Sequence, residues 1–544
     1  MKRTYLFLIL SIFVFNLSSK ETSTGQGIAY YKAGFPQVAK SLLFDEYSSD
    51  ILNRTEICYY LGNIYFEENQ LDSASYCFNK GFNVEPLNSF NVIGNSMIKM
   101  KYDLAGAETN IKSILKIKGN NKNENVMIAI SRAYLMNSLT VKALDYCELA
   151  KDINPKSSSV AVLFGDIKLE QQDLGEACSN YELAILYDEN CKEAYIKYAR
   201  AYKNVNPKLS IEMLNRLKQK DPAFLLVDKE LADIYYVQNN FDEAAKLYNS
   251  YLQSGNSSIQ DLTKYAMTLF LNNDFSKSLE VAQLGLQKAP RNPAFNRLVM
   301  WNNVDLKKYG DALKAADLFF NQTDHPDFTY LDYRYYGQAL RETKQFDLSI
   351  LQFQTALKMD SSKIELWKDI SDMYNDKADY LNSITAYTQY LKKLDESKKT
   401  CDVIIALGKL YYSLGNNSST DPLIKKRALS EADSIFAIVA VKEPTGYRGN
   451  FWRARANAAL DPETLLGLAK PYYDQTVSLV ESKADPKYNS VLIECYSYLG
   501  YYSLLQKNNT LSLSYWDKII AIDPSNSTAK KAIDGIQKAL KGKI

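Results

Sequence analysis

Histidine is nearly absent from this chain of 544 residues, since His325 is its only copy. Catalytic arrangements that need an imidazole beside a nucleophile would all depend on this one residue, and no sequence pattern places a serine or cysteine next to it. The cysteines show no CxxC spacing of the kind that holds zinc, and no glycine-rich phosphate loop follows a strand pattern. The sequence therefore predicts a protein that is not an enzyme and that has no metal and no cofactor.

A strong net charge of either sign is also missing. The chain has 65 Lys and Arg against 63 Asp and Glu, which gives a formal net charge of +2. Because the two signs are interspersed, there is no basic field of the kind that binds nucleic acid. Beyond the first residues, no apolar run approaches the roughly 20 residues that span a bilayer. We expect neither a nucleic-acid partner nor a transmembrane segment after the leader, although peripheral association with the envelope stays possible.

The first residues differ in character from the rest. Lys2 and Arg3 precede an uncharged apolar run over 5–15, and small polar residues follow up to Ser19. This arrangement is typical of a secretory signal peptide, which we predict for residues 1–19. An uncleaved anchor is the alternative, and the first cysteine, Cys58, is too distant to carry a lipid. We therefore expect an exported protein, in the periplasm or at the periplasmic face of a bacterial envelope.

Seven cysteines in an exported protein raise the question of disulfides. The pairs Cys58 with Cys77 and Cys178 with Cys191 are the candidates. The number is odd, however, and most of the cysteines fall at helix positions where a free thiol behaves as a small hydrophobe. Free thiols are the favoured interpretation, and a native disulfide remains open.

Prolines mark a regular period in the sequence. Pro86, Pro155, Pro222 and Pro290 lie 69, 67 and 68 residues apart, close to twice a period of about 34 residues. Small and large residues recur between them. The two clearest copies have the same internal spacing: Gly62, Tyr65, Ala74, Phe78 and Pro86 in one, and Ser131, Tyr134, Ala143, Cys147 and Pro155 in the other. A small residue lets two antiparallel helices approach closely, an aromatic residue fills the space between them, and proline ends the second helix.

This pattern resembles the tetratricopeptide repeat (TPR) over nearly the whole chain after the leader. The resemblance implies an all-α fold, a right-handed superhelical solenoid of antiparallel helix pairs. We expect an array of about fourteen repeats over 20–526, with the later repeats degenerate. An inserted loop is predicted near 415–427, and a capping helix and tail at 527–544. Another type of paired-helix solenoid is the alternative.

The resemblance also implies that the first helices of successive repeats line a concave binding face. We expect the position three residues before each first-helix small residue to be exposed on this face. It is apolar or neutral early in the chain, at Tyr59, Asn91, Ile128, Val162 and Ile196, and mostly cationic later. We predict a basic and aromatic groove at about 294–375 that binds an acidic or carboxylate-bearing peptide. Its predicted residues are Arg297, Arg334 and Arg341 as donors, Trp301 as apolar anchor, and Gln338 and Lys368 beside them. A solvated helix face, with Asp372 and Glu342 as weak partners, is the competing interpretation.

The function predicted from these observations is a non-enzymatic scaffold or adaptor in the bacterial cell envelope. It would bind a protein or peptide along the concave TPR surface. The alternative is a periplasmic module that binds extended peptides or glycans, since sugar rings stack on exposed aromatic side chains. Some members of the family bind the C-terminal tails of chaperones through a lysine and asparagine pair with further basic residues. This combination is not found in the repeat register of this sequence.

Overall fold

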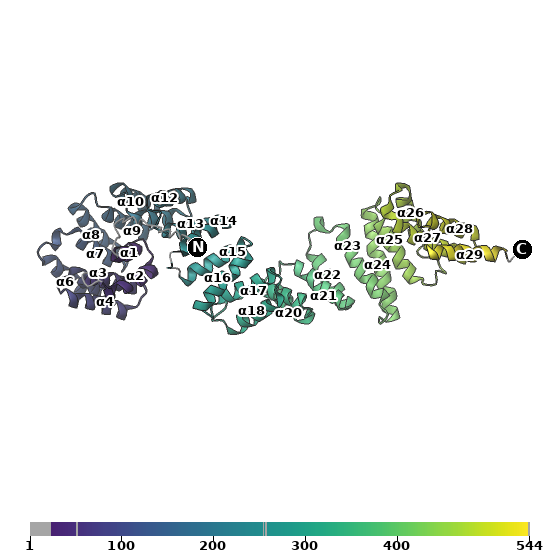
Figure 1. Cartoon of the computed structure of the whole chain (residues 1–544), viewed down its shortest axis with the longest axis horizontal. Coiled ribbons are helices and arrows are strands. Elements are labelled where there is room, and N and C mark those ends of the chain that lie inside the picture. Colours follow the sequence, from purple (N-terminus) through teal and green to yellow (C-terminus); the bar gives the residue numbers. More distant parts are fainter. Residues whose placement is uncertain (1–22, 50–52, 87, 254, 256–257, 542–544) are drawn as a thin grey trace, which may run out of the picture. The chain divides into compact units, whose positions relative to one another are not determined.

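The computed structural model describes residues 23–49, 53–86, 88–253, 255 and 258–541, and the predicted signal peptide at 1–19 lies outside them. The described part is all helical and contains no strand, which confirms the predicted fold class. The chain divides into two compact units, which we call unit 1 (Met1–Asn302) and unit 2 (Asn303–Ile544). Helices alternate along both units as first and second members of successive pairs (Figure 1).

Unit 1 contains eight helix pairs within its described residues, followed by a helix that continues into unit 2. These helices are α1 (Ser23–Lys32), α2 (Pro36–Ser49), α3 (Arg54–Glu67), α4 (Leu71–Val84), α5 (Ser89–Lys99), α6 (Leu104–Lys116), α7 (Glu124–Leu135), α8 (Thr140–Ile153), α9 (Ser158–Glu170), α10 (Leu174–Tyr187), α11 (Lys192–Tyr202), α12 (Pro207–Lys220), α13 (Leu226–Val237), α14 (Phe241–Leu252), α15 (Ile259–Leu271), α16 (Phe275–Lys288) and α17 (Pro293–Asp305). A short 3-10 helix at Asn120–Lys122 precedes α7.

Unit 2 continues the alternation and ends on an unpaired helix. Its helices are α18 (Tyr309–Gln322), α19 (Tyr330–Glu342), α20 (Phe346–Met359), α21 (Glu365–Asp376), α22 (Tyr380–Lys393), α23 (Cys401–Asn416), α24 (Pro422–Lys442), α25 (Arg448–Leu460), α26 (Lys470–Val480), α27 (Asn489–Leu505), α28 (Asn509–Ile522) and α29 (Ser527–Lys541). Short 3-10 helices lie at Glu396–Lys398, Glu481–Lys483 and Pro486–Tyr488. The last α-helix, α29, occupies the segment where the sequence predicts a capping helix.

The turn between the first and second helix repeats its backbone geometry in many of the pairs. A residue with positive φ reverses the chain between first and second helix, and it recurs at intervals of 34 residues in several consecutive repeats. Such pairs of positions are Ser138 and Gln172, Asn239 and Asn273, and Lys344 and Ala378. Left-handed backbone is uncommon outside glycine and is most accessible to asparagine, so its recurrence is a property of the repeat. The 34-residue period read from prolines is thus also present in the backbone.

Small residues lie against aromatic rings, as the sequence pattern predicts. A Cβ atom added to Gly62 in α3 would lie 2.3 Å from the Phe78 ring, and one added to Gly94 in α5 would lie 2.4 Å from it. The ring of α4 is therefore held between two first helices that approach closely because they lack side chains at these points. Equivalent contacts join Gly165 to Tyr181, Gly337 to Phe353 and Gly408 to Phe436.

Where serine occupies a small-residue position of either helix, its hydroxyl bonds across the helix pair. Ser131 donates to the Ala143 carbonyl oxygen at 2.6 Å, and Ser349 donates to the Gly337 oxygen at the same distance. Both serines are completely buried. A buried hydroxyl without a partner would destabilise the fold, so these bonds make serine tolerable in a slot that requires a small side chain.

The predicted inserted loop at 415–427 is wrong in its extent. Helix α23 runs to Asn416 and α24 begins at Pro422, which leaves 417–421 as the link. Asp421 caps α24 by accepting bonds from the backbone N–H groups of Leu423 at 2.8 Å and Ile424 at 3.3 Å. Proline at the first helical position suits such a start, because its missing N–H would be unpaired anyway. The extra residues therefore lengthen a helix to 21 residues.

Candidate binding site

The first helices of unit 1 form a continuous inner layer, because their side chains bond from one repeat to the next. The Tyr31 hydroxyl in α1 donates to Glu67 in α3 at 2.7 Å. Lys197 in α11 bonds to Asp166 in α9 at 2.5 Å. These contacts join odd-numbered helices directly and make them the wall of one shared interior.

Helix α1 and the turn that follows it close this interior by packing against helices about 170 to 190 residues further along. Tyr30 and Phe35 belong to the same buried cluster as Ala199 of α11 and Leu231 of α13. The Tyr30 ring meets the Phe224 ring edge-on at 5.6 Å. In this way the inner face of unit 1 is closed on itself.

Arg200 of α11 stabilises the closure by binding to the turn between α1 and α2. Its Nη1 donates to the Gly34 carbonyl oxygen at 3.1 Å, and its guanidinium lies 4.4 Å from the centre of the Phe35 ring. Its Nε and Nη2 both bond to Glu230, a buried carboxylate of α13. Gly34 has a φ of +79°, and a Cβ there would lie 2.3 Å from Arg200. The left-handed backbone conformation favours glycine at this turn, and a side chain there would also displace the end of Arg200.

Replacing Arg200 should loosen the closure. Arg200→Ala removes the bond to Gly34 and leaves Glu230 buried without its cation, and a charged hydrogen bond contributes about 1.5–3 kcal/mol. We expect amide hydrogen exchange in α1 and α2 to accelerate by roughly 10- to 100-fold. Lys208→Ala, at an exposed lysine of α12, is the matched control. Unchanged exchange in α1 and α2 of the Arg200 variant would contradict the assigned closure.

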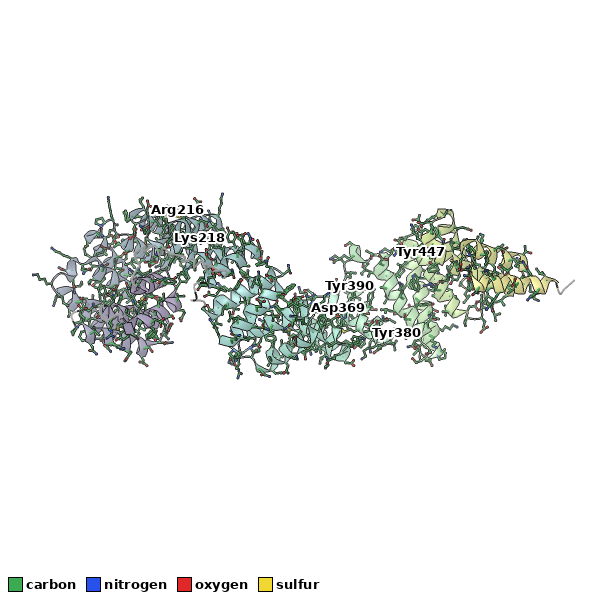
Figure 2. The ribbon with its side chains drawn as sticks, in the orientation of Figure 1. Arg216, Lys218, Asp369, Tyr380, Tyr390 and Tyr447 are labelled. Carbon is green, nitrogen blue, oxygen red and sulfur yellow. The ribbon has the colours of Figure 1, made fainter. Side chains whose placement is uncertain are left out.

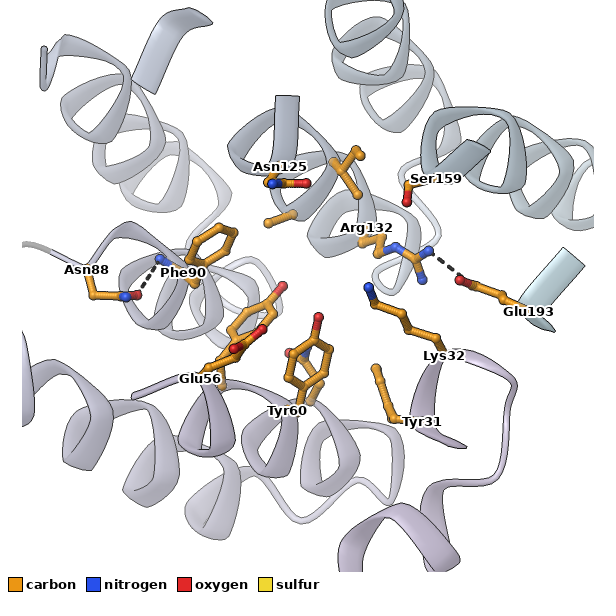
Figure 3. Close-up of a pocket in the computed structure, with 14 residues that line it drawn as sticks. Tyr31, Lys32, Glu56, Tyr60, Asn88, Phe90, Asn125, Arg132, Ser159 and Glu193 are labelled. Atoms are coloured by element: carbon orange, nitrogen blue, oxygen red, sulfur yellow. Dashed lines mark hydrogen bonds and ion pairs between the residues drawn. The ribbon is translucent and has the colours of Figure 1, made fainter. Parts of the chain in front are cut away.

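The closed interior contains a cavity of about 370 Å³. That volume lies within the range of small-molecule pockets, which is roughly 300–1,000 Å³. Figure 3 shows side chains from several first helices directed into it. The lining residues come from α1, α3, α5, α7, α9 and α11 and from the cap of α5: Tyr31, Lys32, Glu56, Tyr59, Tyr60, Asn63, Asn88, Phe90, Asn125, Ile128, Ala129, Arg132, Ser159 and Glu193.

One wall of the cavity is a chain of aromatic rings. Tyr31 meets Tyr60 at 5.5 Å between ring centres, Tyr60 meets Tyr59 at 5.3 Å, and Tyr59 meets Phe90 at 5.6 Å. Edge-to-face and tilted contacts of this kind fix the rings relative to one another. Burial raises the pKa of Tyr59 to about 12, so this hydroxyl is protonated at neutral pH. The wall therefore offers ring surface together with neutral hydroxyls.

Arg132 and Glu193 also line the cavity, and behind them they belong to a partly buried network of charges. Arg132 bonds to Glu193 at 3.2 Å, Lys197 lies 3.0 Å from the same carboxylate, and the Tyr181 hydroxyl donates to Asp166 at 2.9 Å. Burial raises the pKa of Glu193, but Lys197 and Arg132 outweigh burial and hold it at about 2. Burial lowers the pKa of Arg132, but Glu193 and Asp166 outweigh it, and the net shift is upward. With their pKa values shifted in these directions, Glu193 and Arg132 are both charged at neutral pH.

No protein-family model and no curated protein matches this sequence. Among solved structures, the C-terminal part of a TPR repeat-containing protein from Cytophaga hutchinsonii is 28% identical, with 50% of this chain and 99% of that chain covered and a TM-score of 0.40. A TPR protein from Parabacteroides merdae is 16% identical, with 46% and 98% covered and a TM-score of 0.31. The APC/C hetero-tetramer Cut9-Hcn1 is 16% identical, with 91% and 98% covered and a TM-score of 0.30.

The repeat geometry of the chain itself decides the fold assignment. Helix pairs with a left-handed turn recur at 34 residues, and a small residue of the first helix meets an aromatic ring of the second. The fold is a TPR array. In such an array each repeat touches mainly its neighbours, so a contact between α1 and α11 is an added feature of this TPR chain.

Several inner positions of the TPR array are not exposed. The closure covers two of them, and the third, Asn91, packs against the preceding repeat, where its Nδ2 donates to the Thr55 carbonyl oxygen at 3.1 Å. The sequence predicts that Asn91, Val162 and Ile196 lie on an exposed concave face, but all three are completely buried. Ile196 and Val162 belong to the cluster that also contains Tyr30 of α1. The prediction is wrong here because it treats the inner face as an open surface.

Of the predicted groove residues, Arg297 and Trp301 belong to unit 1. Trp301 is only 6% exposed, and its ring lies 5.4 Å from Phe270 of α15. The Arg297 guanidinium lies 5.8 Å from the Trp301 ring. The prediction that Trp301 is an exposed apolar anchor is therefore wrong, since this side chain fills the space between repeats.

The other predicted groove residues belong to unit 2. Arg341 of α19 forms an ion pair with Asp369 of α21 at 3.0 Å, where the sequence suggested Asp372 or Glu342 as weak partners. Figure 2 labels Asp369 on its helix. Arg334 and Lys368 are exposed, Gln338 is half-buried, and neither cation forms an ion pair with a described residue.

The described residues also bear on metal-ion sites, membrane-spanning helices and disulfides. Its residues contain no cluster of three or more His, Cys, Asp or Glu side chains suited to a metal ion. None of its helices combines the length and the apolar character that crossing a membrane requires. All seven cysteines are free thiols, and five of them are buried.

Of the cavity residues, the repeat template placed Tyr59 and Ile128 on the inner face, but the charged residues were not anticipated from the sequence. Arg132, Glu193 and Lys197 look like ordinary helix charges, and Glu193 with Lys197 has the spacing of a common surface pair. The density of tyrosine at Tyr59 and Tyr60 was a usable signal. It did not locate a site, because nothing local shows that α1 closes over these helices.

Proposed function

We propose that this protein is a non-enzymatic scaffold of the bacterial cell envelope that binds protein partners along the first-helix face of its TPR array. The basic and apolar leader at residues 1–19 supports the exported location. The repeat fold supports the scaffold role, because a solenoid offers an extended surface in place of a deep catalytic cleft. The site of partner binding proposed here is the first-helix face of unit 2.

One observation supports the first-helix face of unit 2 as the binding surface. Arg334 of α19 and Lys368 of α21 are exposed and form no ion pair with a described residue, although cations elsewhere on the first helices are mostly paired. The neighbouring cation Arg341 is paired with Asp369, which orients it across the same two helices. Unpaired cations on a rigid surface favour a partner segment with acidic side chains or a free carboxylate.

Charge reversal tests the proposal. The variant with Arg334→Glu and Lys368→Glu should lose a specific protein partner in pull-downs from envelope extract, while circular dichroism shows the fold intact. The control is Lys358→Glu, which reverses an exposed charge on the second helix α20 and should keep the partner. Binding of the identified partner should also weaken as salt rises, because exposed charges are screened. Retention of the same partner by the double variant would refute this face as the binding surface.

A further inference from the structure

We propose that the cavity of unit 1 is a binding site for a small acidic sugar, a ring of uronic-acid type with one or two rings in all. Its carboxylate would be held by Lys32, Arg132 and Tyr60, and its ring would lie against the aromatic wall. This inference is independent of the scaffold function, which uses unit 2.

Three donors converge on the cavity, and each has unused capacity. Lys32 forms no ion pair with a described residue, and the Tyr60 hydroxyl has no hydrogen-bond partner among the described residues. Arg132 carries five N–H donors, and one of them, on Nη2, bonds to Glu193. Figure 3 shows the Lys32 and Tyr60 side chains pointing into the cavity, and the Arg132 guanidinium beside the Lys32 ammonium, bonded to Glu193. An ammonium, a guanidinium and a hydroxyl that line one cavity are the donor set for a carboxylate.

Acidic groups near the cavity do not cancel this donor set. The Glu193 carboxylate is 9% exposed and is already bonded to Arg132 and Lys197. Glu56 is exposed and lies on the side of the cavity that carries Tyr60 (Figure 3). A carboxylate in that place can accept hydrogen bonds from ligand hydroxyls.

The rest of the lining distinguishes a sugar from a purely aromatic acid. Asn63, Asn125 and Ser159 supply amide and hydroxyl groups that both donate and accept, which suits a molecule with several hydroxyls. The rings from Tyr31 to Phe90, which are inclined to one another, supply the apolar faces against which a sugar ring stacks. Only Phe90, Ile128 and Ala129 contribute lining that is purely apolar.

The closure of unit 1 argues against an extended peptide in this place. A peptide that runs along the inner face needs a groove open over several repeats. Here α1 packs on α11 and α13, and Ile196 and Val162 are covered completely. What remains is a cavity of about 370 Å³, the size of a small-molecule pocket.

Titration of the purified full chain with D-galacturonate and with D-galactose tests the proposal, by calorimetry or ligand-observed NMR. We expect galacturonate to bind and galactose to bind at least about tenfold more weakly, because the charged hydrogen bonds are lost. Lys32→Gln should weaken galacturonate binding about tenfold, and Tyr60→Phe should weaken it severalfold. Lys208→Gln, outside the cavity, should leave the affinity unchanged.

Other outcomes overturn the proposal. Equal binding of galactose and galacturonate would refute the carboxylate site. Binding of 4-hydroxyphenylacetate in place of galacturonate would show an aromatic-acid site, and absence of binding by both acids would refute an anion site. Because Lys32 and Tyr60 make no bond that holds the fold, their variants remain folded, and circular dichroism checks this. The double variant of Arg334 and Lys368 should bind galacturonate normally, which separates this test from that of the scaffold role.

Discussion

Phe78→Ala should lower the free energy of unfolding by about 3–5 kcal/mol, the usual cost of removing a fully buried aromatic side chain. The Phe78 ring is completely buried between Gly62 and Gly94, neither of which has a side chain to fill the space that is left. Helix backbones relax only partly into such a space, so a cavity remains. Urea unfolding followed by far-UV circular dichroism measures the loss.

The matched control for this variant lies on the same helix. Tyr76→Ala removes an aromatic ring that is 65% exposed, and we expect a change within about 0.5 kcal/mol. Because each repeat contacts mainly its neighbours, faster hydrogen exchange in the Phe78 variant should be concentrated in α3 to α6. Equal losses from the two substitutions would show that the assigned repeat register is wrong.

Glu193→Gln should destabilise unit 1 by about 3 kcal/mol at neutral pH, because it removes the shared carboxylate from two partly buried cations. Arg132 lies 3.2 Å and Lys197 3.0 Å from this carboxylate, whose side chain is 9% exposed. Lys197 would keep Asp166 as partner, which moderates the loss. Thermal unfolding of both proteins at neutral pH measures the difference.

The pH dependence of this difference follows from the pKa of Glu193, which is held at about 2 in the folded protein. The unfolded carboxyl has an ordinary pKa near 4.3, so its depressed folded pKa contributes stability that is fully present above about pH 5. This contribution is lost as the pH falls from about 4.3 towards 2. The gap between the original protein and Glu193→Gln should therefore narrow on acidification. A gap that stays constant over this range would contradict the role of the ionised carboxylate.

The local repeat was predictable because its signals lie within a few tens of residues. The spacing of Gly62 and Phe78 sets the approach of two helices, and the structure places the ring against the glycine as expected. Helix ends were less predictable where two signals competed. Around 415–427, asparagine and serine suggested a loop, but the Asp421 cap and Pro422 begin a helix within it.

Of the groove predicted near 294–375, some residues are exposed and others are buried, because the repeat template does not account for contacts between repeats. Trp301 and Arg334 both lie at inner-face positions by the repeat template, yet one is 6% exposed and the other is exposed. The template gives the direction of a side chain within its own repeat. It does not tell whether a neighbouring ring such as Phe270 already covers that position.

By itself, the sequence determined the helix pair, its 34-residue period and the contact of small residues with aromatic rings, because neighbouring residues fix these features. Only the tertiary structure decided that unit 1 closes and that a polar cavity with an aromatic wall remains inside it. The closure brings Arg200 within hydrogen-bond distance of Gly34. Each repeat is rotated slightly relative to the one before it, and the distance between two such distant residues depends on the sum of these rotations. No single repeat contains that sum, so no local pattern predicts it.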